Sequence, residues 1–178
     1  MSRKYKFRDQ NRHYFVTLTV TKWIDIFIRD KYKDILIDSF KHCQKNKGLE
    51  IYSYCIMTSH VHMIVGTIGD TFSQIFRDMK KFTSKKIKKE ITQSNEESRK
   101  DWLLKLLRNK NTNSFELWQE GSHPIELNSL YMMEQKLDYI HENPVVAGFV
   151  NKAEDWIYSS ASDYCNNKKG LLDITWAN

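Results

Sequence analysis

Two apolar stretches separated by only two residues restrict the fold of this chain most strongly. Residues 51–57 are aromatic and almost wholly apolar, and residues 60–66 follow directly after Thr58 and Ser59. Runs of this length that are rich in β-branched and aromatic residues favour strands, and so short a connection indicates an antiparallel hairpin. The chain is therefore expected to build its core around an antiparallel sheet.

Strands and helices alternate around this hairpin. Residues 14–21 place their side chains alternately on two faces, which predicts a strand. Residues 30–46 carry apolar side chains at steps of three and four, and Gly48 follows them, so a helix is expected to end there. A second helix is expected to begin at Thr71, because Thr71 and Gln74 match a capping box.

The second half of the chain is expected to add three elements, which are a short helix within 94–110, a short strand at 115–119 and a last helix over 128–142. Ser94 and Glu97 are spaced to cap the first of these helices. Asn143 and Pro144 are expected to end the last helix, because proline disfavours helical geometry in the residue before it.

The resulting order, β-α-β-β-α-(α)-β-α, predicts an α+β fold. It matches the ferredoxin-like, split βαβ pattern, an antiparallel sheet with helices packed on one face. A chain of 178 residues fits one domain over 1–178. We expect a basic N-terminal arm at 1–12 and a C-terminal tail of loops and short elements at about 145–178.

Composition excludes several classes of protein. A hydrophobic fraction of 40% supports a core, which excludes a wholly disordered chain. Three cysteines without CxxC spacing argue against a disulfide framework or a cysteine zinc site and favour a reducing cytoplasm. No apolar stretch approaches the ~20 residues that span a bilayer, so no membrane partner is expected. The net charge of +6 favours a polyanionic partner.

His60 and His62 form the first candidate site. On a strand they point to the same face, with Cα atoms roughly 6.5–7 Å apart, whereas Val61 and Met63 point into the core. Two neutral imidazoles on a rigid strand can converge on one divalent metal ion. The alternative is a pair of exposed sheet histidines without a ligand.

Tyr139 and Asn143 form the second candidate site. They are four residues apart, hence on one helical face, while Leu137 and Ile140 lie on the side that faces the core. The carboxamide oxygen of Asn143 could complete a metal site with two histidines, and the phenol of Tyr139 would then lie beside the metal. The alternative is that Tyr139 only packs and that Asn143 only ends the helix.

Basic residues gather in two segments. Seven basic residues and one acid, Asp78, lie between Arg77 and Lys89. Such a run can be a solvated helix face, or it can follow a phosphate backbone while aromatic residues elsewhere stack on unpaired bases. The candidate DNA-binding residues are Arg3, Lys4, Lys6, Arg8, Arg12, Arg77, Lys80, Lys81, Lys85 and Lys88.

Four segments together carry a resemblance to a known family. They are Met57-x-x-His60-Val61-His62, Leu117-Trp118-Gln119-Glu120-Gly121, Asp138-Tyr139-Ile140-His141-x-Asn143-Pro144-Val145-x-Ala147-Gly148 and Trp156-x-Tyr158-Ser159-Ser160-Ala161. The chain resembles the IS200-type single-tyrosine transposases, and their REP-associated tyrosine transposase branch most closely, from about residue 13 to 164. The pattern departs from many relatives at Thr58-Ser59, where they have Pro-Asn, and residues 91–113 are an insertion without a match.

The resemblance implies a metal-dependent HUH endonuclease that acts on single-stranded DNA folded into an imperfect hairpin. The family's metal ligands for Mg²⁺ or Mn²⁺ match His60, His62 and Asn143, and its nucleophile matches Tyr139. Tyr139 would attack a DNA phosphorus and leave a 5′-phosphotyrosine link, which a second 3′-hydroxyl can resolve. Relatives act as monomers or homodimers.

Other functions remain open from the sequence. One alternative is an HUH nicking enzyme of the replication-initiator or relaxase type, and another is a non-catalytic protein that binds DNA hairpins. The general base is also open, and a water near the metal, His141 and Glu142 are the candidates.

Overall fold

The computed structural model of the chain describes residues 6–166 and 168–176. Its centre is a four-stranded sheet in the order β2-β3-β1-β4, and every neighbouring pair of strands is antiparallel. The strands are β1 (Tyr14–Thr19), β2 (Leu49–Ile56), β3 (His60–Thr67) and β4 (Ile125–Glu126). The predicted hairpin is present: β2 and β3 pair with each other, and the turn that contains Thr58 and Ser59 connects them.

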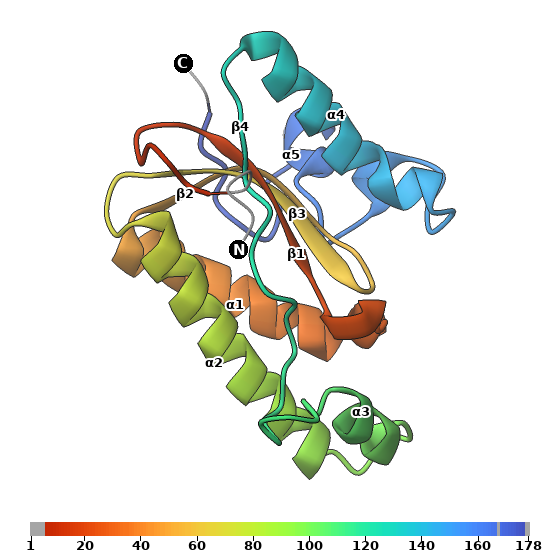
Figure 1. Ribbon diagram of the computed structural model, residues 1–178. Coiled ribbons are helices and arrows are strands. Elements are labelled where there is room, and N and C mark those ends of the chain that lie inside the picture. The colour runs from red at the N-terminus through yellow and green to blue at the C-terminus, as the bar shows by residue number, and fades with distance from the viewer. Residues whose placement is uncertain (1–5, 167, 177–178) are drawn as a thin grey trace.

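The sheet has helices on both of its faces, with α1 and α2 on one and α4 on the other (Figure 1). The helices are α1 (Asp30–Lys47), α2 (Phe72–Gln93), α3 (Lys100–Leu106), α4 (Leu130–Val146) and α5 (Ala161–Asn166), with short 3-10 turns η1 (Thr21–Trp23), η2 (Ile26–Ile28) and η3 (Ala153–Asp155). The predicted ferredoxin-like α+β fold is confirmed, with α1 and α2 on one face. The expectation that the helices pack on one face is wrong for α4, because Ile140 of this helix packs against Phe15 and Ile64 on the opposite face.

Strand alternation divides the core into two clusters. Val61 and Met63 of β3 are fully buried among α1 and α2, as the sequence predicts for these positions. On the opposite face, Phe15 and Ile64 pack against Ile140 of α4 in a smaller cluster. The odd-numbered and even-numbered residues of β3 therefore serve different cores, and His60 and His62 belong to the α4 face.

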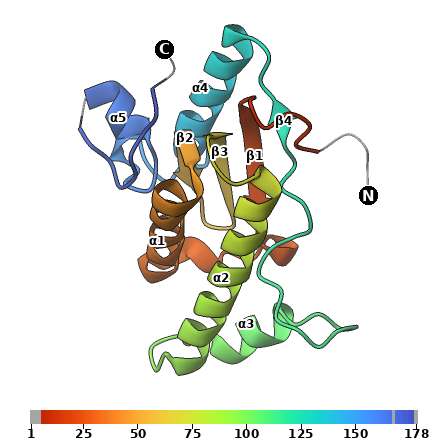
Figure 2. The ribbon, with the colours of Figure 1, turned by 90° about the vertical axis from the view of Figure 1, so that its left-hand side faces the viewer.

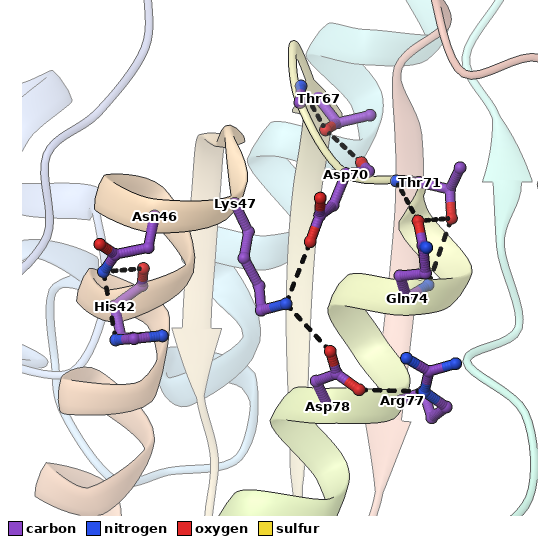
Figure 3. A network of polar contacts seen from close by, with 10 residues as sticks. His42, Asn46, Lys47, Thr67, Asp70, Thr71, Gln74, Arg77 and Asp78 are labelled. Atoms are coloured by element: carbon purple, nitrogen blue, oxygen red, sulfur yellow. Dashed lines mark hydrogen bonds and ion pairs between the residues drawn. The ribbon is translucent and has the colours of Figure 1, made fainter.

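The end of α1 is anchored to the start of α2. Gly48 caps α1 with a φ of +70°, and a Cβ there would lie 2.6 Å from the backbone nitrogen of Gly69, so only glycine fits. The ammonium group of Lys47 donates to Asp70 at 3.0 Å and to Asp78 at 2.9 Å, which joins the two helices (Figure 3). The predicted capping box of Thr71 with Gln74 is also confirmed.

The prediction that α4 ends before Pro144 is wrong, because the helix continues to Val146. Pro144 removes only one backbone hydrogen bond, to Ile140, and its ring is buried. The last turn is closed beyond it, where the amide of Ala147 donates to the carbonyl of Asn143 at 3.0 Å. Asn143 is thus inside the helix rather than at its end, which fixes its side chain on the same face as Tyr139.

The fourth strand is also displaced from its predicted position. Residues 115–119 make only isolated bridges, such as Trp118 with Val20, while the strand itself is β4 at Ile125–Glu126. A two-residue strand has too little alternation for a sequence pattern to reveal. The segment nevertheless runs along the sheet edge, since the amide of Gln119 donates to the carbonyl of Thr19 at 2.8 Å.

The segment 91–113, predicted to be an insertion, is attached through a buried carboxylate. Ser94 and Glu97 do not cap a helix as predicted, because Ser94 ends α2 and α3 begins only at Lys100. The side chain of Glu97 is buried and pairs with Arg29 at 3.1 Å and Arg99 at 3.0 Å. Burial alone would raise its pKa, but hydrogen bonds from Arg99 and Tyr32 hold the pKa at about 2.

The C-terminal tail covers the free edge of β2. The amide of Ile56 donates to the carbonyl of Tyr158 at 2.9 Å, and the amide of Thr175 donates to the carbonyl of Ile51 at 2.8 Å. Figure 2 shows this segment and α5 on the β2 side of the sheet. None of the described helices has both the length and the apolar character needed to cross a bilayer.

Candidate active site

His60 and His62 lie side by side at the start of β3. Their ring centroids are 4.7 Å apart, so the two imidazoles share one face of the sheet as their spacing predicts. Burial lowers the pKa of His60 below its usual value, although the side chain of Asn143 opposes the shift. Burial, with smaller contributions from His60 and Lys136, lowers the pKa of His62 to about 3. Both rings are therefore neutral near pH 7 and keep a lone pair for a ligand.

The orientation of His62 is fixed by the neighbouring strand. Thr17 of β1 is its direct cross-strand partner, and the Thr17 hydroxyl lies 3.0 Å from Nδ1 of His62. Phe15 stacks on the same imidazole with ring centroids 5.4 Å apart. With Nδ1 engaged by Thr17, Nε2 is the nitrogen that faces α4.

Helix α4 brings Tyr139 and Asn143 to the histidines. The hydroxyl of Tyr139 lies 3.5 Å from Nε2 of His62, at the long limit of a hydrogen bond. Asn143, one turn further along, lies beside His60 and raises the pKa of its imidazole. Tyr139 is 48% exposed, so much of its side chain is open to a large substrate. The four residues selected from the sequence thus meet in one place within one chain.

Lys136 is a further charged residue at this place that the sequence analysis did not select. Its ammonium lies 4.9 Å from the ring centroid of Phe15 and 5.5 Å from that of Tyr139. Lys136 is three residues before Tyr139, a spacing that brings side chains together on a helix. The helical spacing could have revealed this neighbour, whereas the contacts of Thr17 and Phe15 depend on strand register.

The two protein candidates for a general base differ in position. The ring nitrogen Nε2 of His141 lies 2.8 Å from the hydroxyl of Ser160 and 3.2 Å from that of Ser53. Burial lowers the pKa of His141 to about 4, so the ring is a neutral member of a buried network. Glu142 is exposed on α4. The contacts of His141 direct it toward β2 and away from the Tyr139 hydroxyl.

The basic residues of α2 lie next to a groove at the sheet edge. A cavity of about 620 Å³ runs between α2 and residues 114–121, and its lining includes the exposed side chains of Lys81, Lys85 and Lys88. Lys80 is also there, but its ammonium donates to the carbonyls of Gln119 and Gly121, and burial lowers its pKa to about 8. Among the described residues, the groove is thus lined by three lysines without an ion pair and by one lysine that the backbone engages.

The remaining basic candidates are distributed over the surface. Arg77 pairs with Asp78 at 2.9 Å, as Figure 3 also shows. Lys6 and Arg8 are exposed, and Arg12 is exposed with a 3.6 Å contact to Asp9. Arg3 and Lys4 lie outside the described residues.

The donor atoms at the site suit a hard or borderline divalent cation. Two neutral imidazole nitrogens and one carboxamide oxygen are ligands that such ions accept, and Nε2 of His62 has no partner among the described residues closer than a 3.5 Å contact. Within the part of the chain that the structure describes, no three residues of the His, Cys, Asp and Glu types gather as a metal cluster. The candidate therefore depends on Asn143 as its third protein ligand.

Comparison with known proteins identifies the family. A family model described as "Transposase IS200 like" matches residues 10–142, about three quarters of the chain. The chain belongs to the IS200-like transposase family. It is accordingly an enzyme of DNA recombination that binds DNA. A search of curated proteins found no match to this IS200-like transposase.

Solved structures match this IS200-like transposase at low sequence identity. One is a REP-associated tyrosine transposase bound to a REP hairpin, with a TM-score of 0.68, 20% identity, and coverage of 100% of this chain and 92% of that chain. Another is a candidate transposase of Deinococcus radiodurans R1, with a TM-score of 0.46, 19% identity, and coverage of 80% and 95%. The first establishes that the fold extends through the tail, beyond the residues of the family match.

Proposed function

We propose that this IS200-like transposase is a metal-dependent strand transferase that cleaves and rejoins single-stranded hairpin DNA through a 5′-phosphotyrosine at Tyr139. The observation that carries the proposal is the 3.5 Å distance between the Tyr139 hydroxyl and Nε2 of His62. An exposed phenol next to two neutral imidazoles is suited to attack a phosphate held at the same imidazoles.

In the reaction, the hydroxyl oxygen of Tyr139 attacks the DNA phosphorus in line with the leaving group. A new bond forms between this oxygen and phosphorus, the bond from phosphorus to the 3′ oxygen breaks, and the 3′ oxygen leaves as a hydroxyl. The phenolic proton passes to solvent, and solvent supplies the proton that the leaving 3′ oxygen takes up. Lys136, whose ammonium is 5.5 Å from the Tyr139 ring, provides positive charge beside the phenolate and the attacked phosphate.

His60, His62 and Asn143 would hold one Mg²⁺ or Mn²⁺ ion. When bound, the ion polarises a non-bridging phosphate oxygen and offsets the charge that develops there. The hydroxyl of Thr17 would then accept a hydrogen bond from the protonated Nδ1 of His62, which would leave the lone pair on Nε2. Three neutral protein ligands make a weak site, and substrate oxygens would strengthen it.

The proposed substrate is supported by the fold and by the charge distribution. The similar solved structure contains a REP hairpin, and the shared fold covers the whole of this chain. We therefore assign the chain to the REP-associated branch. Lys81, Lys85 and Lys88 line an open groove in which a phosphate backbone could lie, and the N-terminal arm would add further contacts.

A single copy of the chain is proposed to carry a complete site. Tyr139 and Asn143 of α4 contact the histidines of the same chain, so no residue has to come from a second copy. A monomer is therefore sufficient for the first cleavage step.

The experiment is a denaturing gel of labelled hairpin oligonucleotides taken from inverted repeats beside the gene, incubated with Mn²⁺. The wild-type chain is expected to give a covalent protein–DNA adduct, and Tyr139→Phe, which removes one oxygen, is expected to give none. Tyr131→Phe is the matched control, because Tyr131 lies on the same helix, is 73% exposed and is two turns away from the site. An adduct that survives Tyr139→Phe would overturn the proposed nucleophile.

A further inference from the structure

An exposed tryptophan lies directly beside the histidine pair. Trp23 is 57% exposed, yet its ring centroid is only 5.4 Å from that of His60, with the two planes at 67°. The indole thus contacts a residue of the candidate active site on one side, and much of its remaining surface is open to solvent. A large apolar surface left uncovered at an active site has a free-energy cost unless a ligand covers it.

The backbone that presents Trp23 is strained. Lys22 and Trp23 have φ values of 58° and 57°, in the left-handed region that residues other than glycine rarely adopt. Neither residue has the short polar side chain that tolerates this region. Strain of this kind persists where surrounding contacts enforce it, and it occurs preferentially at functional sites.

Several hydrogen bonds enforce this conformation. The amide of Trp23 donates to the carbonyl of Val20 at 2.9 Å, and the amide of Val20 donates to the carbonyl of Ser59, next to His60. The ammonium of Lys22 donates to the carbonyl of Leu106 at 2.9 Å, in the insertion. The turn is therefore held from the catalytic strand on one side and from the insertion on the other.

We propose that Trp23 stacks on an unpaired nucleobase of the single strand, next to the phosphate that Tyr139 attacks. The inference rests on the proposed function, since it needs DNA at His60 and His62. An indole face offers a broad stacking surface to any base, but only a base outside a duplex has a free face to offer in return. Trp23 would thus hold the strand in place and favour single-stranded over paired DNA at the cleavage position.

Exposure alone does not distinguish Trp23 from Trp102 and Trp176, which are 51% and 56% exposed. Trp176 is 56% exposed, but it packs on Tyr164 with centroids 4.8 Å apart, near the C-terminus. Among the described residues, Trp176 is not one of those with a positive φ, so its backbone lacks the strain found at Trp23. Trp176 therefore provides a control with equal exposure and no contact with the histidines.

The first test is photocrosslinking with a short oligothymidylate in which single thymines are replaced by 5-iodouracil, a base that reacts with an aromatic side chain stacked on it. Mass spectrometry of the wild-type chain should place a crosslink on Trp23, and pairing the probe with its complement should abolish that crosslink. A crosslink on Trp176 instead, or an equal yield with the paired probe, would overturn the proposal.

The second test measures affinity for the same single strand by fluorescence anisotropy. Trp23→Ala should weaken binding by roughly 5- to 150-fold, the range for one stacked base, while Trp23→Phe keeps a stacking ring and loses much less. Trp176→Ala should bind as the wild type does. Equal affinities for Trp23→Ala and the wild type, with melting temperatures unchanged, would refute the stacking role.

The two proposals fail separately. If the wild type forms the Tyr139 adduct but Trp23→Ala binds and reacts equally well, the stacking inference is wrong and the strand-transfer proposal stands. If the crosslink forms on Trp23 but no adduct forms with Mn²⁺, the stacking surface is supported and the proposed chemistry is wrong.

Discussion

Replacing Thr17 with valine tests whether His62 is a metal ligand that a second residue orients. The Thr17 hydroxyl lies 3.0 Å from Nδ1 of His62, and His62 is only 6% exposed, so water cannot readily replace the lost partner. Valine has nearly the shape of threonine but offers no oxygen. The substitution therefore leaves the strand pairing in place and removes one hydrogen bond.

The expected loss follows from that single bond. A buried group left without its partner costs about 1–3 kcal/mol, which corresponds to roughly 5- to 150-fold in an equilibrium. Loss of a partner that orients a metal ligand typically weakens metal binding by about 10- to 100-fold. We expect Thr17→Val to raise the Mn²⁺ concentration needed for half-maximal binding by an amount in this range, and excess Mn²⁺ to restore adduct formation.

The assay combines electron paramagnetic resonance titration of Mn²⁺, with hairpin DNA present, and the denaturing adduct gel. Thr19→Val is the matched control, because Thr19 is paired with His60 on the same strands. Among the described hydrogen bonds, none joins the side chain of Thr19 to either histidine. If Thr17→Val binds Mn²⁺ as tightly as Thr19→Val and the wild type do, the assignment of His62 as an oriented ligand is refuted.

Three further predictions concern the assembly, the charge and the anchoring of the insertion. A mixture of Tyr139→Phe with His62→Ala should form no adduct in the gel assay, whereas restored activity would mean that α4 is exchanged between copies. Affinity for hairpin DNA should fall as salt rises. Replacing Lys81, Lys85 or Lys88 of the groove with glutamine should reduce the magnitude of the slope of log K against log salt by about 0.7–0.9 for each phosphate contact removed. Because the pKa of Glu97 is held at about 2 in the fold, against 4.5 for a carboxyl in water, its stabilising effect is complete above pH 4.5 and is lost as pH falls toward 2. Glu97→Gln should therefore lower the free energy of unfolding by about 3 kcal/mol at pH 7 and by much less near pH 2, as measured by urea titration; a deficit of equal size at both pH values would contradict this.

Local patterns in the sequence determined the elements that lie near one another in the chain. The β2–β3 hairpin, the Gly48 cap and the Thr71–Gln74 capping box depend on residues within a few positions of each other, and all three are present. Alternation along β3 also placed both histidines on one face, because the period of a strand is fixed by its backbone geometry.

The sequence failed where long-range packing outweighs a local preference. Pro144 reads as a helix stop, but its ring is buried at the end of α4, where the loss of one hydrogen bond is tolerated. Ser94 and Glu97 have the spacing of a helix cap, but Glu97 instead forms an ion pair with Arg29, which is distant in the sequence. The conformation is decided by burial in the core for Pro144 and by a partner distant in the sequence, Arg29, for Glu97.

The candidate site divides in the same way. Its residue types and the spacing of Tyr139 and Asn143 were readable, since a helix places residues four apart on one face. The position of α4 over the sheet face that carries the two histidines depended on the packing of Ile140 against Phe15 and Ile64. The contact between Thr17 and His62 depended on the β1–β3 register. The strained turn that holds Trp23 beside His60 was likewise decided by the tertiary structure, because hydrogen bonds from β3's turn and from the insertion enforce a conformation that the local sequence disfavours.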